Sequence, residues 1–366
     1  MDLPMSMPTP TTTRIELVPL DDDELAARAS QRGLRRASSL AYPWPGRCNP
    51  AAERAEVAAA AWVARHGMLR DPSTAARFRG VQVGLLAAMA YPDASPKLLE
   101  LIAQVMAWIF IQDDVYDTAA PSEQRPERLE SLFERYLTVL RTGVAAPGAE
   151  PTVQALADLA RRLSELGSPT WYIHFVETMR RFWMDGVVVE TYYRARGLSP
   201  DPASYMALRV QTVGVYICLD LLELALGEEL SPDVREDPIL RRVTWLTSRI
   251  IAYVNDVFSY DKERRVGDVN NYLHVMQRCE PLTLAAVVDH TIRAHDRELD
   301  QLGQLDSTVR DHGPRMTKLV ERYIDGCRTW MAGSLEWQRI SSRYASGRVL
   351  LAGGDSSDDE RVARSG

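Results

Sequence analysis

The sequence predicts an all-α fold in a single domain, and three observations support this prediction. At several places along the chain, a residue that can cap a helix is followed directly by proline. Apolar residues recur with the helical period after these pairs, and no stretch alternates between apolar and polar residues for long enough to suggest a β-strand. With 46% hydrophobic residues, the 366-residue chain can bury a large core. We therefore expect a helical bundle with its site between facing helices.

The two ends of the chain differ from its middle. Residues 1–44 contain several prolines and an acidic run at 21–24 without helical periodicity, which predicts a flexible N-terminal lead-in. Within it, Pro43 and Trp44 are expected to pack in an extended conformation against the domain. Residues 351–366 are rich in Gly, Ser and Asp and predict a disordered tail. Residues 45–350 then form the folded domain.

The predicted helices begin, in chain order, at the pairs of capping residue and proline. The side-chain oxygen of the first residue accepts a backbone N–H at the helix start, and proline in the first turn has no N–H to lose. The pairs are Asn49-Pro50, Asp71-Pro72, Ser95-Pro96, Ser168-Pro169, Asp201-Pro202 and Asp237-Pro238, with Glu150-Pro151 and Glu280-Pro281 as weaker starts. Gly67 and Gly197 indicate helix ends.

Charge and composition exclude several classes of protein. The chain has 43 Lys and Arg against 50 Asp and Glu, a net charge of −7, which argues against nucleic-acid binding through bulk positive charge. It lacks an apolar run of transmembrane length and a secretory signal, so we expect no membrane partner and a cytoplasmic location. The wide spacing of the four cysteines predicts free thiols at Cys48, Cys218, Cys279 and Cys327. We expect His290 and His295 to be solvated.

The helix that begins at Pro96 leads into an acidic cluster. Its apolar stripe ends at Phe110, and Asp113, Asp114 and Asp117 follow. Asp113 and Asp117 are four residues apart, so they share one helix face, about 6 Å apart along the axis. Carboxylates placed in this way suit Mg²⁺, which prefers oxygen ligands. Taken alone, the pattern is equally compatible with a solvated acidic face.

The long helix that begins at Pro238 carries a second cluster of oxygen donors. Asn255, Ser259 and Glu263 recur at every fourth position and form one ladder along the helix. An amide, a hydroxyl and a carboxylate can together chelate one Mg²⁺ with low net charge. A chance ladder on a polar surface is a weaker explanation once both clusters stand in one chain, because unpaired charge in a bundle core is costly.

The two clusters resemble the metal-binding motifs of class I terpene synthases, the aspartate-rich DDxxD motif and the NSE motif. The first motif is matched by Asp113, Asp114 and Asp117. The second is matched by Asn255, Asp256, Ser259 and Glu263, with Lys262 at the basic position before the glutamate. The resemblance covers about residues 49–345 and implies a single-domain helical bundle with a central active-site cavity.

Further positions follow from this resemblance. Bacterial members carry a diphosphate-sensing arginine 46 positions before the asparagine of the NSE motif, and that position holds Arg209. Thr212 and Val213 fall at the linker and effector positions, and Gly214 beside them allows a helix break. The linker is often acidic in the family, whereas the Thr212 hydroxyl can bond the sensor only as an uncharged partner. Near the C-terminus, Arg343 and Tyr344 match the family's Arg-Tyr pair.

The resemblance implies the Mg²⁺-dependent ionisation and cyclisation of an acyclic isoprenyl diphosphate. It implies three Mg²⁺ ions, with metal ligands at Asp113, Asp117, Asn255, Ser259 and Glu263, and with Asp114 orienting a neighbouring basic residue. The diphosphate would be bound by Arg209, Lys262, Arg343 and Tyr344. Phe110 is the best candidate to stabilise a carbocation through its aromatic face, and weaker candidates are Phe182, Trp183, Trp330 and Trp337.

The substrate and product are expected from the overall resemblance. It favours farnesyl diphosphate and a cyclic sesquiterpene, with geranyl or geranylgeranyl diphosphate as alternative substrates because motifs do not give the pocket depth. An enzyme that elongates isoprenyl chains would carry a second aspartate-rich motif in place of the NSE motif. A non-catalytic scaffold would be free to lose the ligands that this chain retains. A homodimer is left open.

Overall fold

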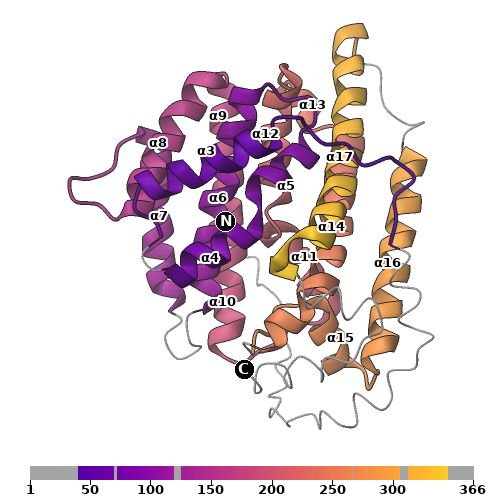
Figure 1. Cartoon of the computed structure of the whole chain (residues 1–366). Helices are drawn as coiled ribbons and strands as arrows, with labels where there is room; N and C mark the ends of the chain where they lie inside the picture. The colour runs from indigo at the N-terminus through magenta and orange to yellow at the C-terminus, as the bar shows by residue number, and fades with distance from the viewer. Residues whose placement is uncertain (1–39, 70–71, 119–124, 266, 306–311, 345–366) are drawn as a thin grey trace, which may run out of the picture.

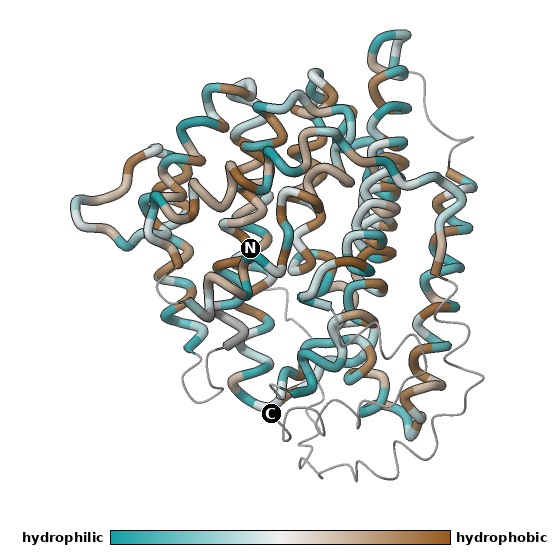
Figure 2. The backbone as a smooth tube through the Cα atoms, in the orientation of Figure 1, coloured by the Kyte–Doolittle hydropathy of each residue, from teal (hydrophilic) through white to brown (hydrophobic). Residues whose placement is uncertain are grey.

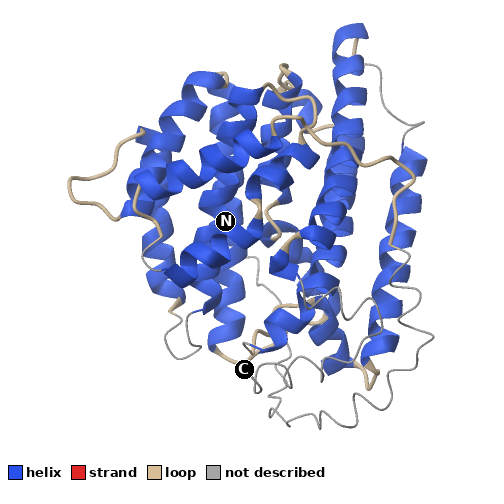
Figure 3. Cartoon of the chain, in the orientation of Figure 1, coloured by secondary structure: helices blue, strands red, loops and turns tan. Residues whose placement is uncertain are grey.

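The computed structural model describes residues 40–69, 72–118, 125–265, 267–305 and 312–344, and over these residues every regular element is helical (Figure 3). The helices are α3 (Ala52–Arg65), α4 (Pro72–Val81), α5 (Val83–Ala90), α6 (Pro96–Thr118), α7 (Pro126–Thr142), α8 (Pro151–Leu166), α9 (Pro169–Arg180), α10 (Val188–Ala195), α11 (Pro202–Thr212), α12 (Val215–Leu226), α13 (Pro232–Arg235), α14 (Pro238–Arg265), α15 (Tyr272–Cys279), α16 (Leu284–Leu305) and α17 (Pro314–Ile340). A π-helical turn, Arg181–Val187, joins α9 to α10, and a 3₁₀ turn, Ser342–Tyr344, follows α17. The predicted all-α class is confirmed. The predicted tail and residues 1–39 of the lead-in lie outside the described residues.

Six of the eight predicted pairs of capping residue and proline start a helix at the proline, and α3 begins at Ala52, two residues after Pro50. At α9 the Ser168 hydroxyl accepts a hydrogen bond from the Trp171 N–H at 3.1 Å. At α11 the Asp201 carboxylate accepts from the Ala203 N–H at 2.9 Å, and at α14 the Asp237 carboxylate accepts from the Ile239 N–H at 2.8 Å. The predicted starts of α4, α6 and α8 also coincide with their prolines.

The predicted start at Glu280-Pro281 is wrong. The helix α16 begins only at Leu284, and there the Thr283 hydroxyl accepts from the Ala286 N–H at 3.2 Å. Glu280 instead has an extended backbone at the end of α15. A short hydroxyl side chain caps a helix better than a long glutamate side chain, so the nearby threonine takes the capping position.

The helices form two walls joined by α5 and α12 (Figure 1). The helix α5 packs against α3 and α6 on one side and against α17 on the other, while α12 contacts α9, α14 and α17. These two connecting helices are rich in apolar residues along their length (Figure 2). The site described below lies between the two walls.

Two helical segments on the cavity side depart from regular α geometry. Gly214 separates α11 from α12 with a φ of 77°, a conformation that suits glycine because it has no Cβ. Opposite this break, the π-helical turn carries Gly186, and a Cβ there would lie 2.8 Å from Cγ2 of Thr212. The end of α11 therefore lies directly against the π-helical turn.

The described part of the N-terminal segment begins beside α16 and then crosses α17 on its way to α3 (Figure 1). The Tyr42 and Trp44 rings stack with centroids 5.8 Å apart, and Arg339 of α17 donates to the Leu40 carbonyl. The end of the predicted lead-in is thus part of the packed structure. His295 of α16 is 1% exposed and hydrogen-bonded to the Tyr42 hydroxyl at 3.1 Å, so the prediction that it is solvated is wrong.

One stretch of the described residues, Pro202–Leu226, is long and apolar enough to cross a membrane by length and composition. It comprises α11 and α12, which are separated at Gly214. Within the fold, 61% of its most apolar window is buried. Its apolar character is therefore accounted for by its position in the core.

Candidate active site

The acidic cluster lies at the C-terminal end of α6, where it meets the 3₁₀ turn after α17. Arg343 donates from Nη2 to Asp113 Oδ2 at 2.9 Å and from Nη1 to Asp114 Oδ1 at 2.6 Å. Burial alone would lower the pKa of Arg343, but Asp114 and Asp113 outweigh it and the pKa is raised. The guanidinium is therefore a permanent cation at this end of the helix. The side chain of Asp117 lies outside the described residues.

The predicted ladder on α14 faces one cavity with all three of its oxygen donors, Asn255, Ser259 and Glu263. Asn271, which precedes α15, donates from Nδ2 to Glu263 Oε2 at 2.8 Å and to the Asp256 carbonyl at 2.8 Å. Burial, followed by the nearby Asp256 and Asp268, raises the pKa of the Glu263 carboxyl to about 7. The ladder is thus held in place by a residue outside both motifs.

Arg209 of α11 lies against the first part of this ladder. Its Nε donates to Asp256 Oδ1 at 2.9 Å, and its Nη2 donates to Asn255 Oδ1 at 2.6 Å. Asp256 is fully buried and also accepts from the Tyr205 hydroxyl at 2.7 Å. Burial would lower the pKa of Arg209, but the charge of Asp256 outweighs it and the pKa is raised. An arginine and a candidate metal ligand therefore share one hydrogen bond.

Thr212 connects Arg209 to a carboxylate from another helix. Its hydroxyl donates to Glu190 Oε1 of α10 at 2.5 Å and lies 3.5 Å from Arg209 Nη1. Burial raises the pKa of the Glu190 carboxyl to about 7. The residue at the linker position is not acidic, but a carboxylate from α10 thus contacts it.

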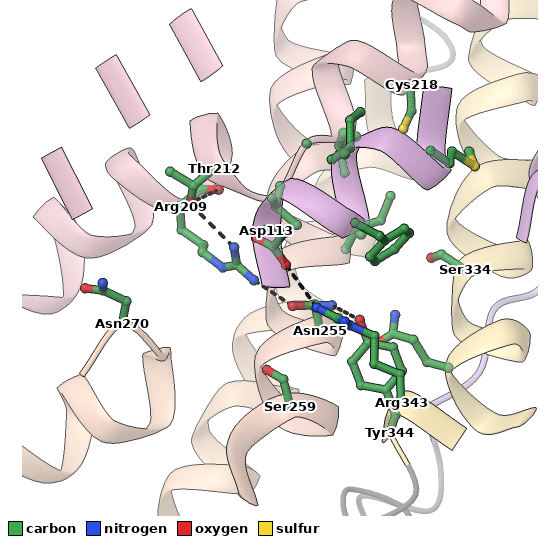
Figure 4. A pocket seen from close by; sticks show the side chains of 18 of the residues that line it. Asp113, Arg209, Thr212, Cys218, Asn255, Ser259, Asn270, Ser334, Arg343 and Tyr344 are labelled. Atoms are coloured by element: carbon green, nitrogen blue, oxygen red, sulfur yellow. Dashed lines mark hydrogen bonds and ion pairs between the residues drawn. The ribbon is translucent and has the colours of Figure 1, made fainter. Parts of the chain in front are cut away.

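These groups lie at one end of a cavity of about 1240 Å³, a volume that includes open solvent at its edge. The cavity is also lined by Lys262, Val213 and Tyr344, and Asn255 Nδ2 donates to the Tyr344 hydroxyl at 2.9 Å. Figure 4 shows Asp113, Arg209, Asn255 and Arg343 converging from separate elements. All predicted metal ligands and diphosphate-binding residues whose side chains are described therefore line the same space.

The remainder of the cavity wall is mostly apolar and aromatic. Four of the predicted aromatic candidates line it: Phe110, Phe182, Trp330 and Trp337. The Phe110 ring lies under the Arg343 guanidinium, with 5.1 Å from Cζ to the ring centroid. Trp183 is instead fully buried in the core, where its ring stacks on Phe133 with the ring centroids 5.5 Å apart. A cavity with a charged end and an apolar body suits a ligand with the same division.

The donor set at the charged end fits a divalent cation that prefers oxygen ligands. The carboxylates of Asp113 and Glu263, the Ser259 hydroxyl and the Asn255 amide oxygen are hard oxygen donors. No group of His, Cys, Asp and Glu side chains is arranged as a ready-made metal site among the residues that the structure describes. The oxygen donors match Mg²⁺, which takes oxygen ligands from proteins and also binds phosphate oxygens.

A family model for the terpene synthase family 2 C-terminal metal-binding region matches residues 104–301. A (+)-T-muurolol synthase from Roseiflexus castenholzii is 33% identical over 306 residues, which cover 84% of this chain and 93% of that protein. The chain belongs to the terpene synthase family. The resemblance inferred from the two motifs is therefore confirmed, and with it the use of a divalent metal and an isoprenyl diphosphate substrate.

Two further comparisons agree with this terpene synthase assignment. A germacrene A synthase from Nostoc punctiforme is 31% identical over 312 residues, which cover 83% of this chain and 94% of that protein. The crystal structure of germacradien-4-ol synthase from Streptomyces citricolor superposes with a TM-score of 0.70 at 26% identity, over 82% of this chain and 97% of that one. The class I helical fold expected from the resemblance is therefore confirmed.

Four residues at or beside this end of the cavity are not among the predicted ones: Glu190, Asn271, Arg194 and Asp268. Glu190 and Asn271 act on predicted residues through the hydrogen bonds given above. Arg194 pairs with Asp268 at 2.9 Å, and both side chains line the cavity with 8% exposure. The nearest signal in the sequence is the polar run 268–271 shortly after the NSE motif. The four cysteines are free, as predicted, and Cys218 lines the cavity.

Proposed function

We propose that this protein catalyses the Mg²⁺-dependent ionisation and cyclisation of farnesyl diphosphate to a cyclic sesquiterpene and inorganic diphosphate. The supporting observation is that two sets of oxygen donors and three cationic side chains meet at one end of an apolar, aromatic-lined cavity. The (+)-T-muurolol synthase relative is named as cyclising (2E,6E)-farnesyl diphosphate, which favours the same substrate here. A cytoplasmic location, without nucleic-acid or membrane partners, belongs to the same proposal, and a homodimer stays open.

The metal ligands in this proposal are Asp113 and Asp117 on α6 and Asn255, Ser259 and Glu263 on α14. Three Mg²⁺ ions held there would supply positive charge that stabilises the departing diphosphate. Asp114 accepts a hydrogen bond from the Arg343 guanidinium, with 2.6 Å between Oδ1 and Nη1, and so orients it toward the charged end of the cavity. The aspartate-rich motif would thus bind metal and also position a cationic side chain, while the NSE motif would bind metal.

The diphosphate would be bound by N–H donors from Arg209, Lys262 and Arg343 and by the Tyr344 hydroxyl. Charged N–H groups form the stronger hydrogen bonds to phosphate oxygens, and these donors come from three elements of the fold. Thr212 and Val213, at the end of α11, would transmit the position of Arg209 to the helix break. The binding of the diphosphate is thereby linked to the geometry of the cavity wall.

Breaking the allylic C–O bond leaves a carbocation in the apolar body of the cavity. The faces of Phe110, Phe182, Trp330 and Trp337 can stabilise positive charge without acting as nucleophiles. The buried, mostly apolar wall keeps bulk water away from the cation. The isoprenoid chain then folds against the wall and cyclises, and the shape of the wall selects the ring system.

The proposal is tested by incubating the purified protein separately with geranyl, farnesyl and geranylgeranyl diphosphate, with Mg²⁺ and with a chelator. Gas chromatography–mass spectrometry of the extracts should give a metal-dependent cyclic product from farnesyl diphosphate. A cyclic product from another chain length would correct the substrate. A longer prenyl diphosphate, or no release of diphosphate, would contradict the proposed activity.

The roles of Glu263 and Arg209 at the charged end of the cavity are tested by the variants Glu263→Gln and Arg209→Ala. We expect each variant to lose turnover, because the first removes a metal-binding carboxylate and the second removes a donor to the diphosphate. Circular dichroism should show unchanged helical content in both variants. Near-normal product formation by the folded variants would contradict the assigned roles.

A further inference from the structure

The cavity wall has a second polar feature, formed by two residues of α17. The helix α17 contributes Ser334 and Gln338 to a wall that is otherwise formed by residues such as Met106, Ile109 and Ile251. Both side chains are buried, with 3% exposure for Ser334 and 1% for Gln338. Figure 4 shows Ser334 on α17, apart from the cluster of Arg209 and Asn255. Neither residue belongs to a motif described above.

The Gln338 side chain contains a buried acceptor without a protein partner. Its Oε1 atom forms no hydrogen bond to any of the residues that the structure describes. Leaving an amide oxygen unsatisfied in an apolar wall is unfavourable, and native proteins relieve such groups with bound water or use them in function. The unsatisfied oxygen therefore suggests that a polar ligand binds inside the cavity.

Ser334 supplies a second acceptor beside the first. Its hydroxyl proton is donated to the Met331 carbonyl at 3.1 Å, so the lone pairs of the oxygen remain for a ligand. Ser334 and Gln338 are four residues apart on α17, and side chains at this spacing are neighbours on one helix face. Two neighbouring acceptors match the two O–H groups of one water molecule.

We propose that Ser334 and Gln338 bind a water molecule that captures the final carbocation, so that the product is a cyclic sesquiterpene alcohol. This inference rests on the proposed function and extends it to the class of product. A water that donates both O–H groups to these two oxygens turns its own lone pairs toward the cavity. It is therefore oriented as a nucleophile toward a cation held there.

The chemical step is balanced without a further reactant. A lone pair of the water oxygen forms the new C–O bond to the cationic carbon and gives a protonated alcohol. That species loses one proton to the inorganic diphosphate produced by the ionisation. Overall, farnesyl diphosphate and water give the alcohol and hydrogen diphosphate, with no change in oxidation state.

The test is turnover of farnesyl diphosphate in ¹⁸O-labelled water, with diphosphate release measured in parallel. We expect the main product to be an alcohol that carries the label. In Gln338→Leu, loss of one acceptor should lower the ratio of labelled alcohol to hydrocarbon about tenfold, and Ser334→Ala should change it in the same direction. The matched control, Gln154→Leu on the exposed face of α8, should keep the wild-type ratio.

The outcomes separate this inference from the proposed function. Diphosphate release with only hydrocarbon products, or an alcohol without the label, would overturn the water site and leave the cyclase proposal intact. Retention of the wild-type ratio in both α17 variants would also overturn it. If the wild-type protein releases no diphosphate, the proposed function fails and the inference fails with it. The melting temperature of Gln338→Leu should not fall, because an acceptor without a protein partner is replaced by an apolar group.

Discussion

Asn271 connects Glu263, the backbone of α14 and the start of α15 next to the charged end of the cavity. Its Nδ2 donates to Glu263 and to the Asp256 carbonyl, both at 2.8 Å, while its Oδ1 accepts from the Leu273 N–H at 2.9 Å at the start of α15. The side chain is fully buried. Because such outer hydrogen bonds orient metal ligands, their loss typically lowers metal affinity by about 10- to 100-fold.

We therefore expect Asn271→Asp to weaken the binding of Mg²⁺ with inorganic diphosphate by at least about tenfold. The aspartate keeps the acceptor that caps α15, but it removes both donated bonds and places a negative charge beside Glu263. Isothermal titration calorimetry measures the affinity, and thermal unfolding reports whether the cap survives. Wild-type affinity in the folded variant would show that Asn271 does not position Glu263.

The residues of the site divide into those that the sequence could identify and those it could not. Asn255, Ser259 and Glu263 are identifiable because one helix imposes their spacing. Glu190 reaches Thr212 only because the π-helical turn before α10 packs against α11, so no local pattern relates the two. Asn271 likewise meets Glu263 through a turn of the chain after α14.

At the scale of helices, starts were more predictable than irregularities. A short polar side chain before proline fixes a start by local chemistry, as at Ser168 and Asp201. The π-helical turn between α9 and α10 has no comparable signal, because its place depends on how α11 packs against it. The break at Gly214 was anticipated from the resemblance, and its φ of 77° now gives it a physical basis.

Gly214→Ala tests the break directly. Space around Gly214 is open, so the expected loss of stability of about 1 kcal/mol arises from the left-handed backbone alone. We also expect reduced turnover, because Thr212 and Val213 end α11 at this break. Thermal unfolding and steady-state kinetics measure the two effects.

The matched control is Gly303→Ala in α16, where space is also open and φ is not in the left-handed region. This change should raise stability by up to about 1 kcal/mol through helix propensity, without an effect on turnover. If Gly214→Ala behaves like the control, the break does not require glycine.

For the whole molecule, the two walls and their connecting helices create a cavity that no segment could form alone. Residues from α6, α10, α11, α14 and α17 line it. The sequence predicted a central cavity from the family resemblance and placed the metal-binding motifs on two helices. It could not predict the polar pair on α17, because Ser334 and Gln338 read as ordinary helix residues until their burial is known.

The stability of the whole fold should depend on pH through His274. The His274 ring stacks on Tyr260 with the ring centroids 4.4 Å apart, and its buried Nε2 has no hydrogen-bond partner among the described residues. Burial, followed by the charge of Arg278, lowers its pKa from 6.5 to about 4. Between these pH values the unfolded chain binds the proton and the folded chain does not, so stability falls as the pH falls.

His274→Phe should keep the ring stacking and remove this dependence. We expect the variant to lose about 2 kcal/mol less than the wild type when the pH is lowered from 7 to 5. Urea unfolding at the two pH values measures the difference. A parallel loss of stability in both proteins would show that His274 does not titrate in this range.

The course of α17 has a consequence for how this protein can diverge. At Gly333 a Cβ would lie 2.5 Å from the Met89 carbonyl oxygen, so α17 is fixed closely against α5. Ten residues later, Arg343 is fixed by Asp113 and Asp114. Inserting or deleting one residue between these two anchors would turn part of the helix by about 100° and carry Gln338 away from the cavity. Evolution can therefore vary this wall by substitution, and hence vary the product, but not by a change in length.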